Sequence, residues 1–184
     1  MPRLFVAIDL PAPLKQQLSA LTTQIDGVRW TETENLHLTL RFIGDVPSET
    51  ASAIQAALSD VQSSPFSLQL NGVGTFPANP RKPPRIIWAG LSNPPAVQSL
   101  HEMIEKTVSD LGPTPDNRPY TPHITLGRVK SADVGTLSAI RRFIEHNAAF
   151  HSEAFIPIEF HLMESQLSPS GPKYVSLARY PLAD

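Results

Sequence analysis

The pattern of hydrophobic and polar positions divides the chain into short segments that alternate between strand and helix periodicity. Residues 3–10 form an apolar run that two prolines end, which is typical of a strand. Leucine and isoleucine then recur at helical spacing between residues 13 and 25. Another strand is expected around residue 37, and a second helix within residues 45–63. The first part of the chain therefore mixes both element types.

The same order of elements occurs twice. Strands are expected at residues 66–76 and 85–91, and the pattern then gives helix 97–108, strand 123–129, helix 137–144, strand 155–164, loop 165–173 and strand 174–180. Units of about 11–91 and 95–180 are too long for solenoid repeats. They predict an α+β fold with two pseudo-symmetric lobes, each a mostly antiparallel sheet with two helices, flanking a central cleft. We therefore expect residues 1–184 to form a single two-lobed domain.

Composition narrows the class of protein. Hydrophobic residues make up 41% and charged residues 17%, as in ordinary globular proteins. No apolar run has the length of a membrane span, and the N-terminus lacks the pattern of a signal peptide, so a cytoplasmic protein is expected. The absence of cysteine excludes disulfides, zinc-thiolate sites and thiol nucleophiles. A net charge of −2 argues against a basic coat for nucleic acid, although residues 79–85 (NPRKPPR) gather three basic side chains.

The short phrase His-x-Thr-Leu occurs at His37 and again 86 positions later at His123. Because side chains alternate along a strand, His37 and Thr39 share one face while leucines occupy the other. The second copy repeats this arrangement, with His123 and Thr125 on one face. If a pseudo-two-fold axis relates the two lobes, both His-Thr pairs face the same cleft. One copy alone is weak evidence for a site, but two copies in matching strands are much stronger.

Two arginines follow the motifs at different spacings. Arg41 has the same parity as His37 and is expected to share its face. Arg128 falls on the opposite face by simple alternation, unless a bulge at Gly127 turns it toward the cleft.

Two imidazoles, two hydroxyls and nearby guanidinium groups suit chemistry at a phosphodiester. In-line displacement at phosphorus needs a base for the attacking hydroxyl group and an acid for the departing oxygen, and two histidines can hold these opposite protonation states. Threonine hydroxyls and arginine can bind the phosphate oxygens. A catalytic zinc site is not expected, because neither motif has a second histidine or a carboxylate at ligand spacing.

Longer phrases carry a resemblance to a known family. The chain resembles the RNA 2′,3′-cyclic phosphodiesterases, also called 2′-5′ RNA ligases, of the two-histidine (2H) phosphoesterase superfamily. The phrases cover nearly the whole chain in the family's order; they are RLFVAIDLP, ENLHLTLRFIGDV, GVGTFPANPRKPPRIIWAGL, RPYTPHITLGRV and ESQLSPSGPKYVSLARYPL.

The resemblance implies hydrolysis of an RNA 2′,3′-cyclic phosphate to a 2′-phosphate, with no metal or other cofactor. His37 would be the proton donor to the leaving 3′ oxygen and His123 the proton acceptor that activates water. Thr39 and Thr125 would hold the phosphate, with Arg128 and Arg41 nearby. The reverse reaction with a 5′-hydroxyl would give a 2′-5′ linkage without ATP. The two motifs are nearly identical, so the assignment of acid and base comes from the resemblance alone.

The expected partners are RNA ends that carry a 2′,3′-cyclic phosphate, tRNA fragments among them. No membrane and no obligate protein partner are implied, and a monomer is expected. Tyr174, which follows the expected 165–173 loop, is the aromatic residue chosen as a candidate for stacking on a base. Two alternatives stay open at this point: a module that binds RNA ends without turnover, and a phosphodiesterase that acts on small cyclic nucleotides or on cyclic phosphates derived from ADP-ribose.

Overall fold

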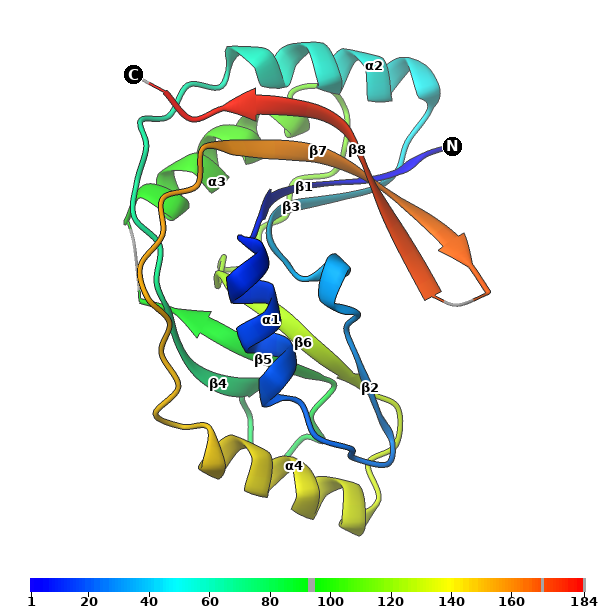
Figure 1. Ribbon diagram of the computed structural model, residues 1–184. Helices are drawn as coiled ribbons and strands as arrows, with labels where there is room; N and C mark the ends of the chain where they lie inside the picture. Colours follow the sequence, from blue (N-terminus) through cyan, green and yellow to red (C-terminus); the bar gives the residue numbers. More distant parts are fainter. Residues whose placement is uncertain (93–94, 170, 184) are drawn as a thin grey trace.

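The computed structural model describes residues 1–92, 95–169 and 171–183 (Figure 1). Within these residues, eight strands form one sheet in the order β4-β5-β6-β3-β1-β7-β8, with β2 paired to β6, and all of their pairings are antiparallel. The strands are β1 (Arg3–Asp9), β2 (Val28–Trp30), β3 (His37–Asp45), β4 (Leu70–Phe76), β5 (Ile86–Leu91), β6 (His123–Val129), β7 (Glu159–Ser168) and β8 (Gly171–Pro181). The helices are α1 (Ala12–Leu21), α2 (Ser48–Ala57), α3 (Pro95–Ser109) and α4 (Val134–His146), with short 3₁₀ turns η1 (Thr33–Asn35) and η2 (Leu58–Asp60).

The sheet divides into two lobes where β3 meets β6 (Figure 1). These two strands share a single paired position, Leu38 opposite Ile124. One lobe holds β3, β1, β7 and β8 with α2 and α3, and the other holds β2, β6, β5 and β4 with α1 and α4. The predicted α+β class, with two mostly antiparallel lobes of two helices each, is confirmed.

Each lobe takes strands from both halves of the chain. The late strand β7 pairs with the first strand β1, whereas the early strand β4 pairs with β5 beside β6. In addition, each of the two motif strands has one further neighbour: β1 pairs with β3, and β5 pairs with β6. The pairing therefore relates β1 to β5 as equivalent strands, although the sequence units drawn at 11–91 and 95–180 leave β1 outside the repeat.

The sequence places most elements within a few residues but misses two features. Residues 165–173 were expected to form a loop, and this expectation is wrong within the described residues (Ser170 lies outside them). Strands β7 and β8 continue as a long hairpin in which Ser165 pairs with Tyr174 and Leu167 with Pro172. The three-residue strand β2 was not expected at all, because so short a segment shows no clear period.

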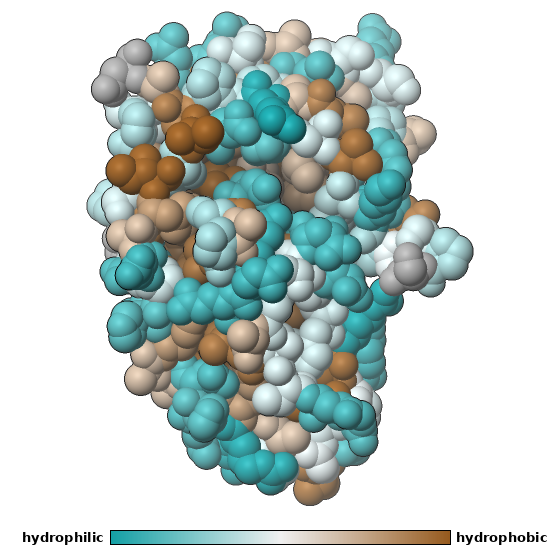
Figure 2. Space-filling model, in the orientation of Figure 1, coloured by the Kyte–Doolittle hydropathy of each residue, from teal (hydrophilic) through white to brown (hydrophobic). Residues whose placement is uncertain are grey.

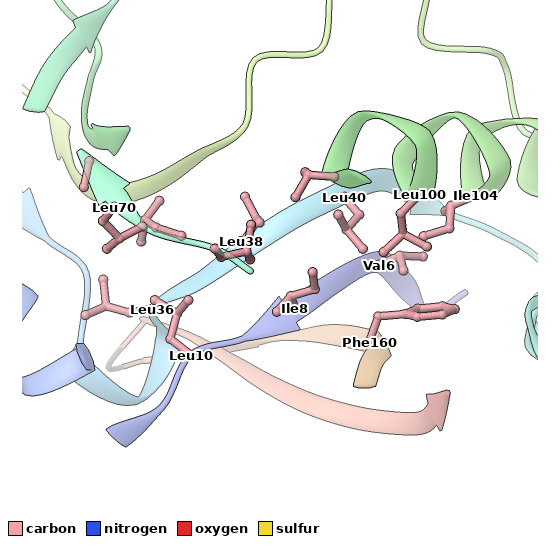
Figure 3. Close-up of a cluster of buried hydrophobic side chains, with 14 of the residues drawn as sticks. Val6, Ile8, Leu10, Leu36, Leu38, Leu40, Leu70, Leu100, Ile104 and Phe160 are labelled. Atoms are coloured by element: carbon pink, nitrogen blue, oxygen red, sulfur yellow. The ribbon is translucent and has the colours of Figure 1, made fainter. Parts of the chain in front are cut away.

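The core lies on one face of the central strands (Figure 3). Val6 and Ile8 of β1 and Leu38 of β3 have no exposed surface, and Leu100 and Ile104 of α3 cover them. Full burial of one such side chain contributes roughly 1.5–3 kcal/mol. The leucines between the motif residues are thus held in the core, which directs His37 and Thr39 to the other face.

On the face that Figure 2 shows, polar side chains are spread over both lobes and apolar side chains lie in small patches between them. No helix in the described ranges has the length and hydropathy that crossing a membrane requires.

Candidate active site

The two His-x-Thr motifs meet at the junction of the lobes. The antiparallel pair Leu38–Ile124 fixes the register between β3 and β6. This register sets His37 beside Thr125 and Thr39 beside His123, all on the face opposite the core. Residues 86 positions apart in the sequence therefore form a compact group of two imidazoles and two hydroxyls.

A cleft of about 290 Å³ opens on this face. His37, Thr39, Thr125, Arg128 and Tyr174 line it, so five of the seven residues singled out from the sequence lie at its wall. The other lining residues are Phe5, Arg29, Trp30, Thr31, Glu32, Asn35, Phe42, Lys130, Ser165, Gly171 and Pro172. His123 is not among the described lining residues, but a charge on His123 lowers the pKa of His37, so the two rings interact electrostatically.

Arg41 lies outside the cleft, and the expectation that it shares the face of His37 is wrong. Val6 pairs with Arg41 and Ala7 with Thr39, so Leu40 is an extra residue in a β-bulge. The bulge interrupts the alternation and turns Arg41 into the interior, where it is 6% exposed and forms an ion pair with Glu105 of α3. The next residue, Phe42, faces the cleft instead.

Arg128 reaches the cleft because β6 contains the matching bulge. Ile87 pairs with Gly127 and Trp88 with Thr125, which leaves Leu126 as the extra residue, next to the glycine considered from the sequence. Gly127 itself lies under Trp30, whose ring would be 2.8 Å from an added Cβ atom. Position 127 therefore accepts glycine alone, while the bulge beside it directs Arg128 to the cleft.

The backbone fixes the tautomer of each histidine. The Nδ1 atom of His37 lies 2.7 Å from the Asn35 carbonyl oxygen, and that of His123 lies 2.7 Å from the Thr121 carbonyl oxygen. A carbonyl oxygen only accepts, so Nδ1 carries the proton in both rings and Nε2 carries the lone pair in the neutral form. The His37 Nε2 atom is 2.9 Å from the Thr39 hydroxyl oxygen. Both rings thus present Nε2 for proton exchange.

Comparison with known proteins decides the family. A family model described as "LigT like Phosphoesterase" matches residues 8–88 and 91–174 of the chain. The chain belongs to the LigT-like phosphoesterases. Among its relatives is the RNA 2′,3′-cyclic phosphodiesterase of Archaeoglobus fulgidus, 33% identical over 181 residues that cover 95% of this chain and 97% of the relative. Another is the protein of the same name from Methanocaldococcus jannaschii, 34% identical over 174 residues, or 94% and 96% of the two chains.

Solved structures agree with the sequence relatives. The crystal structure of E. coli LigT in complex with 3′-AMP is 27% identical to this chain, covers 100% of it and 99% of its own chain, and has a TM-score of 0.80. A structure described only as a phosphoesterase gives a TM-score of 0.81 at 27% identity, with 100% and 99% of the two chains covered.

Electrostatics in this LigT-like cleft keep both histidines neutral at pH 7. Burial lowers the pKa of His37 from 6.5 to about 4, against the opposing effect of the Asn35 carbonyl. Burial also lowers the pKa of His123, and the positive charge of Arg128 acts in the same direction. A bound phosphate anion favours protonation of either ring, because an opposite charge stabilises the charged form. Either ring can therefore act as an acid near neutral pH only when an anion is bound beside it.

Tyr174 packs directly against the phosphoesterase motif. Its ring stands edge-on to His37, with 5.2 Å between ring centroids, and edge-on to Phe5 at 5.0 Å. On the other motif, Phe76 stands edge-on to His123 at 5.0 Å. Each imidazole thus has an aromatic neighbour that limits its rotation.

Sequence reasoning missed the contribution of β2 and its flanks. Arg29, Thr31 and Asn35 line the cleft from β2 and the turn that follows it, and Lys130 lines it just after β6. The polar run just before the first motif was the available signal. Within the described part of the chain, no group of three or more His, Asp or Glu residues is arranged to hold a metal ion.

Proposed function

We propose that this chain hydrolyses RNA 2′,3′-cyclic phosphate ends to 2′-phosphomonoesters by metal-independent acid–base catalysis. The observation that carries the proposal is the meeting of two His-x-Thr motifs, from distant segments, on one face beside a cleft. Membership of the LigT-like family and relatives named RNA 2′,3′-cyclic phosphodiesterase support cyclic phosphodiesterase activity.

In the proposed reaction His123 is the proton acceptor. Its Nε2 lone pair takes a proton from a water molecule, and the water oxygen forms a bond to phosphorus. The Thr121 carbonyl accepts the Nδ1 proton and so leaves Nε2 as the basic atom of the neutral ring.

His37 is the proton donor in the same step. The bond between phosphorus and the 3′ oxygen breaks as Nε2–H of His37 protonates that oxygen, and the phosphate remains on the 2′ oxygen. The ring enters this step protonated because the bound cyclic phosphate raises its pKa. Acid and base catalysis of this kind is typically worth about 10²–10⁴ in rate for each group.

Thr39, Thr125 and Arg128 bind the phosphate in this proposal. Both hydroxyls and the guanidinium group lie at the cleft wall and donate to the non-bridging oxygens, where negative charge increases in the transition state. A 5′-hydroxyl in place of water gives a 2′-5′ phosphodiester through the same bond changes. ATP-independent 2′-5′ RNA ligation is therefore part of the proposal.

The charge of the cleft wall favours RNA over small cyclic nucleotides that carry a single phosphate. Arg29, Arg128 and Lys130 line it, whereas Glu32 is the one carboxylate among the described lining residues. Three cations at one wall suit a ligand with more than one phosphate, which an RNA strand provides.

The test is incubation of the purified protein with an oligonucleotide that ends in a 2′,3′-cyclic phosphate, in excess chelator. We expect turnover and a 2′-phosphate product, identified by resistance to an enzyme that removes only 3′-phosphates. His146→Ala, on the exposed end of α4, is the matched control and should keep full activity.

Three results would count against the proposal. A 3′-phosphate product would contradict the assignment of the leaving oxygen, and loss of activity in chelator would contradict metal-independent catalysis. Tight binding without turnover would support the alternative of a module that recognises RNA ends.

A further inference from the structure

Both β-bulges have two consecutive carbonyl groups that accept hydrogen bonds from outside the strand. In β6 the Thr31 hydroxyl lies 3.0 Å from the Thr125 carbonyl oxygen, and the Thr31 backbone N–H lies 2.8 Å from that of Leu126. In β3 the Tyr120 hydroxyl lies 3.0 Å from the Thr39 carbonyl oxygen. The Nδ1–H group of His101 donates to the Leu40 carbonyl at 2.7 Å. In each motif, the carbonyl groups of the threonine and of the leucine that follows it therefore accept hydrogen bonds from residues outside the strand.

The need for these donors follows from the bulges. Leu40 and Leu126 are the extra residues relative to β1 and β5. At Leu126 the Thr31 N–H continues the pairing of β2 with β6, in which Trp30 lies opposite Gly127, whereas at Leu40 the donor comes from α3. Buried carbonyl groups without a partner are costly, and each requires a donor from another segment. The motif threonine comes just before each extra residue, so the same donors also fix the peptide that carries its hydroxyl.

Different residue types donate these hydrogen bonds in the two lobes. Thr31 alone supplies both donors in one lobe, whereas a stacked pair supplies them in the other. The rings of His101 and Tyr120 lie 3.9 Å apart at an angle of 7°, and His101 is 9% exposed. Burial raises the pKa of Tyr120, so it remains a hydroxyl donor over the whole working pH range. The structure buries His101 behind the bulge.

We propose that Thr31 and the His101–Tyr120 pair are positioning residues for phosphate binding. Thr31 orients the hydroxyl of Thr125, and the pair orients the hydroxyl of Thr39, each through the motif's own backbone. This inference rests on the proposed function, in which those two hydroxyls bind the phosphate. Neither positioning group is required to touch the reacting atoms.

The experiment removes one donor at a time with little change in shape. Tyr120→Phe and Thr31→Val are made in the wild-type chain, in Thr39→Val and in Thr125→Val. We expect each single change to lower kcat by roughly tenfold, since small misplacements of binding groups are costly. Tyr120→Phe should lose its effect, to within about twofold, in Thr39→Val but keep it in Thr125→Val. Thr31→Val should show the opposite pattern.

This crossed pattern separates positioning from general stability. A purely structural role lowers activity by the same factor in every background, and a direct contact between Thr31 and the substrate keeps its effect in Thr125→Val. Two controls remove equivalent hydroxyls elsewhere: Tyr180→Phe, whose hydroxyl binds the Gln55 carbonyl, and Thr107→Val, whose hydroxyl binds the Met103 carbonyl. Both should keep the wild-type kcat.

The possible failures are distinguishable. If the wild-type chain does not turn over the cyclic phosphate, the proposed function fails. If it does, and Tyr120→Phe and Thr31→Val match the two controls or act equally in all backgrounds, the positioning inference is overturned while the function stands. Melting temperatures identify a variant that fails to fold, and Thr31→Ser, which retains the hydroxyl, should then restore kcat to within about twofold of wild type.

Discussion

The chemistry of single residues in the cleft depends on how the backbone presents each imidazole. In both motifs the carbonyl two residues before the histidine accepts the Nδ1 proton. This leaves Nε2 as the atom that exchanges protons, whichever ring is acid or base. The burial that lowers the pKa of both rings then makes the protonated state of the acid dependent on the bound anion. The predictions for single residues therefore concern proton transfer and the pKa values of the two histidines.

Removal of either imidazole should abolish most turnover. We expect His37→Ala or His123→Ala to lower kcat by at least ~10² while the far-ultraviolet circular dichroism spectrum stays that of the wild type. Steady-state kinetics on a cyclic-phosphate oligonucleotide measures the effect. Loss of the folded spectrum in both variants would show that the histidines are structural.

The dependence of rate on pH should lie on the acid side of the usual histidine range. The kcat/KM profile reports the free enzyme, in which both imidazole pKa values are below 6.5, so its optimum is expected below that value. The kcat profile reports the complex and should shift to higher pH, because the phosphate anion raises both values. A profile without any pH dependence would rule out acid–base work by this pair.

The free energy of unfolding should also depend on pH because His37 is buried. Between pH 6.5 and about 4 the unfolded chain binds a proton at this residue that the folded chain does not, so the free energy of unfolding falls as the pH falls. The loss is at most roughly 3 kcal/mol from this group. His37→Asn keeps a donor for the Asn35 carbonyl, and denaturant titrations should show a flatter pH dependence for this variant than for the wild type. Equal slopes would mean that His37 titrates normally.

At the scale of elements, the two bulges decide which arginine is available to a ligand. Both occur at the leucine of the motif, and in each case the residue two positions later faces the cleft, Phe42 in one lobe and Arg128 in the other. The cleft thus receives an aromatic side chain from β3 and a cation from β6. Arg41 lies one position before Phe42, the residue that faces the cleft, and its ion pair with Glu105 lies in the interior.

This difference predicts opposite effects for two arginine variants. Arg41→Met leaves the half-buried Glu105 carboxylate without its cation, and should lower the free energy of unfolding by roughly 3 kcal/mol. Arg128→Met removes an exposed side chain and should leave stability nearly unchanged, but lower kcat/KM by about 10- to 100-fold. Chemical denaturation and kinetics on both variants test the assignment, which an exchange of the two outcomes would refute.

The sequence contains enough to predict the motif strands but not their bulges. In HLTLRF the alternation continues past Leu40, so nothing in the pattern signals that Arg41 turns inward. In HITLGR the glycine does provide such a signal, because a residue without a side chain allows the close approach of Trp30. The hairpin arm of β7 and β8 was missed for another reason: its residues face solvent and the cleft, so they lack the apolar alternation by which strands are recognised.

At the scale of the whole molecule, the hairpin arm of one lobe reaches the wall built by the other. The Asn35 side chain donates to the Pro172 carbonyl at 2.9 Å, and an added Cβ atom on Gly171 would lie 2.3 Å from the Arg29 guanidinium group. Gly171 also has a φ of +129°, which other residues rarely adopt. The cleft is thus closed at this end by contacts that span both lobes.

The basic wall should make catalysis on a longer RNA more sensitive to salt. Each phosphate contact adds to the slope of log affinity against log salt concentration, by about 0.7 for single strands. We expect kcat/KM for an oligonucleotide to fall more steeply with salt than kcat/KM for a mononucleoside 2′,3′-cyclic phosphate. Equal slopes would favour a small cyclic nucleotide as the natural substrate.

The exchange of strands between the two halves of the chain has a consequence for how such a protein can arise. In a fragment that ends before β5, the strand β4 has no neighbour to pair with, and the edge of β1 that β7 occupies is open. A chain of half the length can satisfy both edges by folding β4 onto β1, or by exchanging this strand with a second copy. If the exchange first occurred in a one-motif homodimer, fusion of the two genes would make it permanent and leave each cleft wall able to acquire its own side chains.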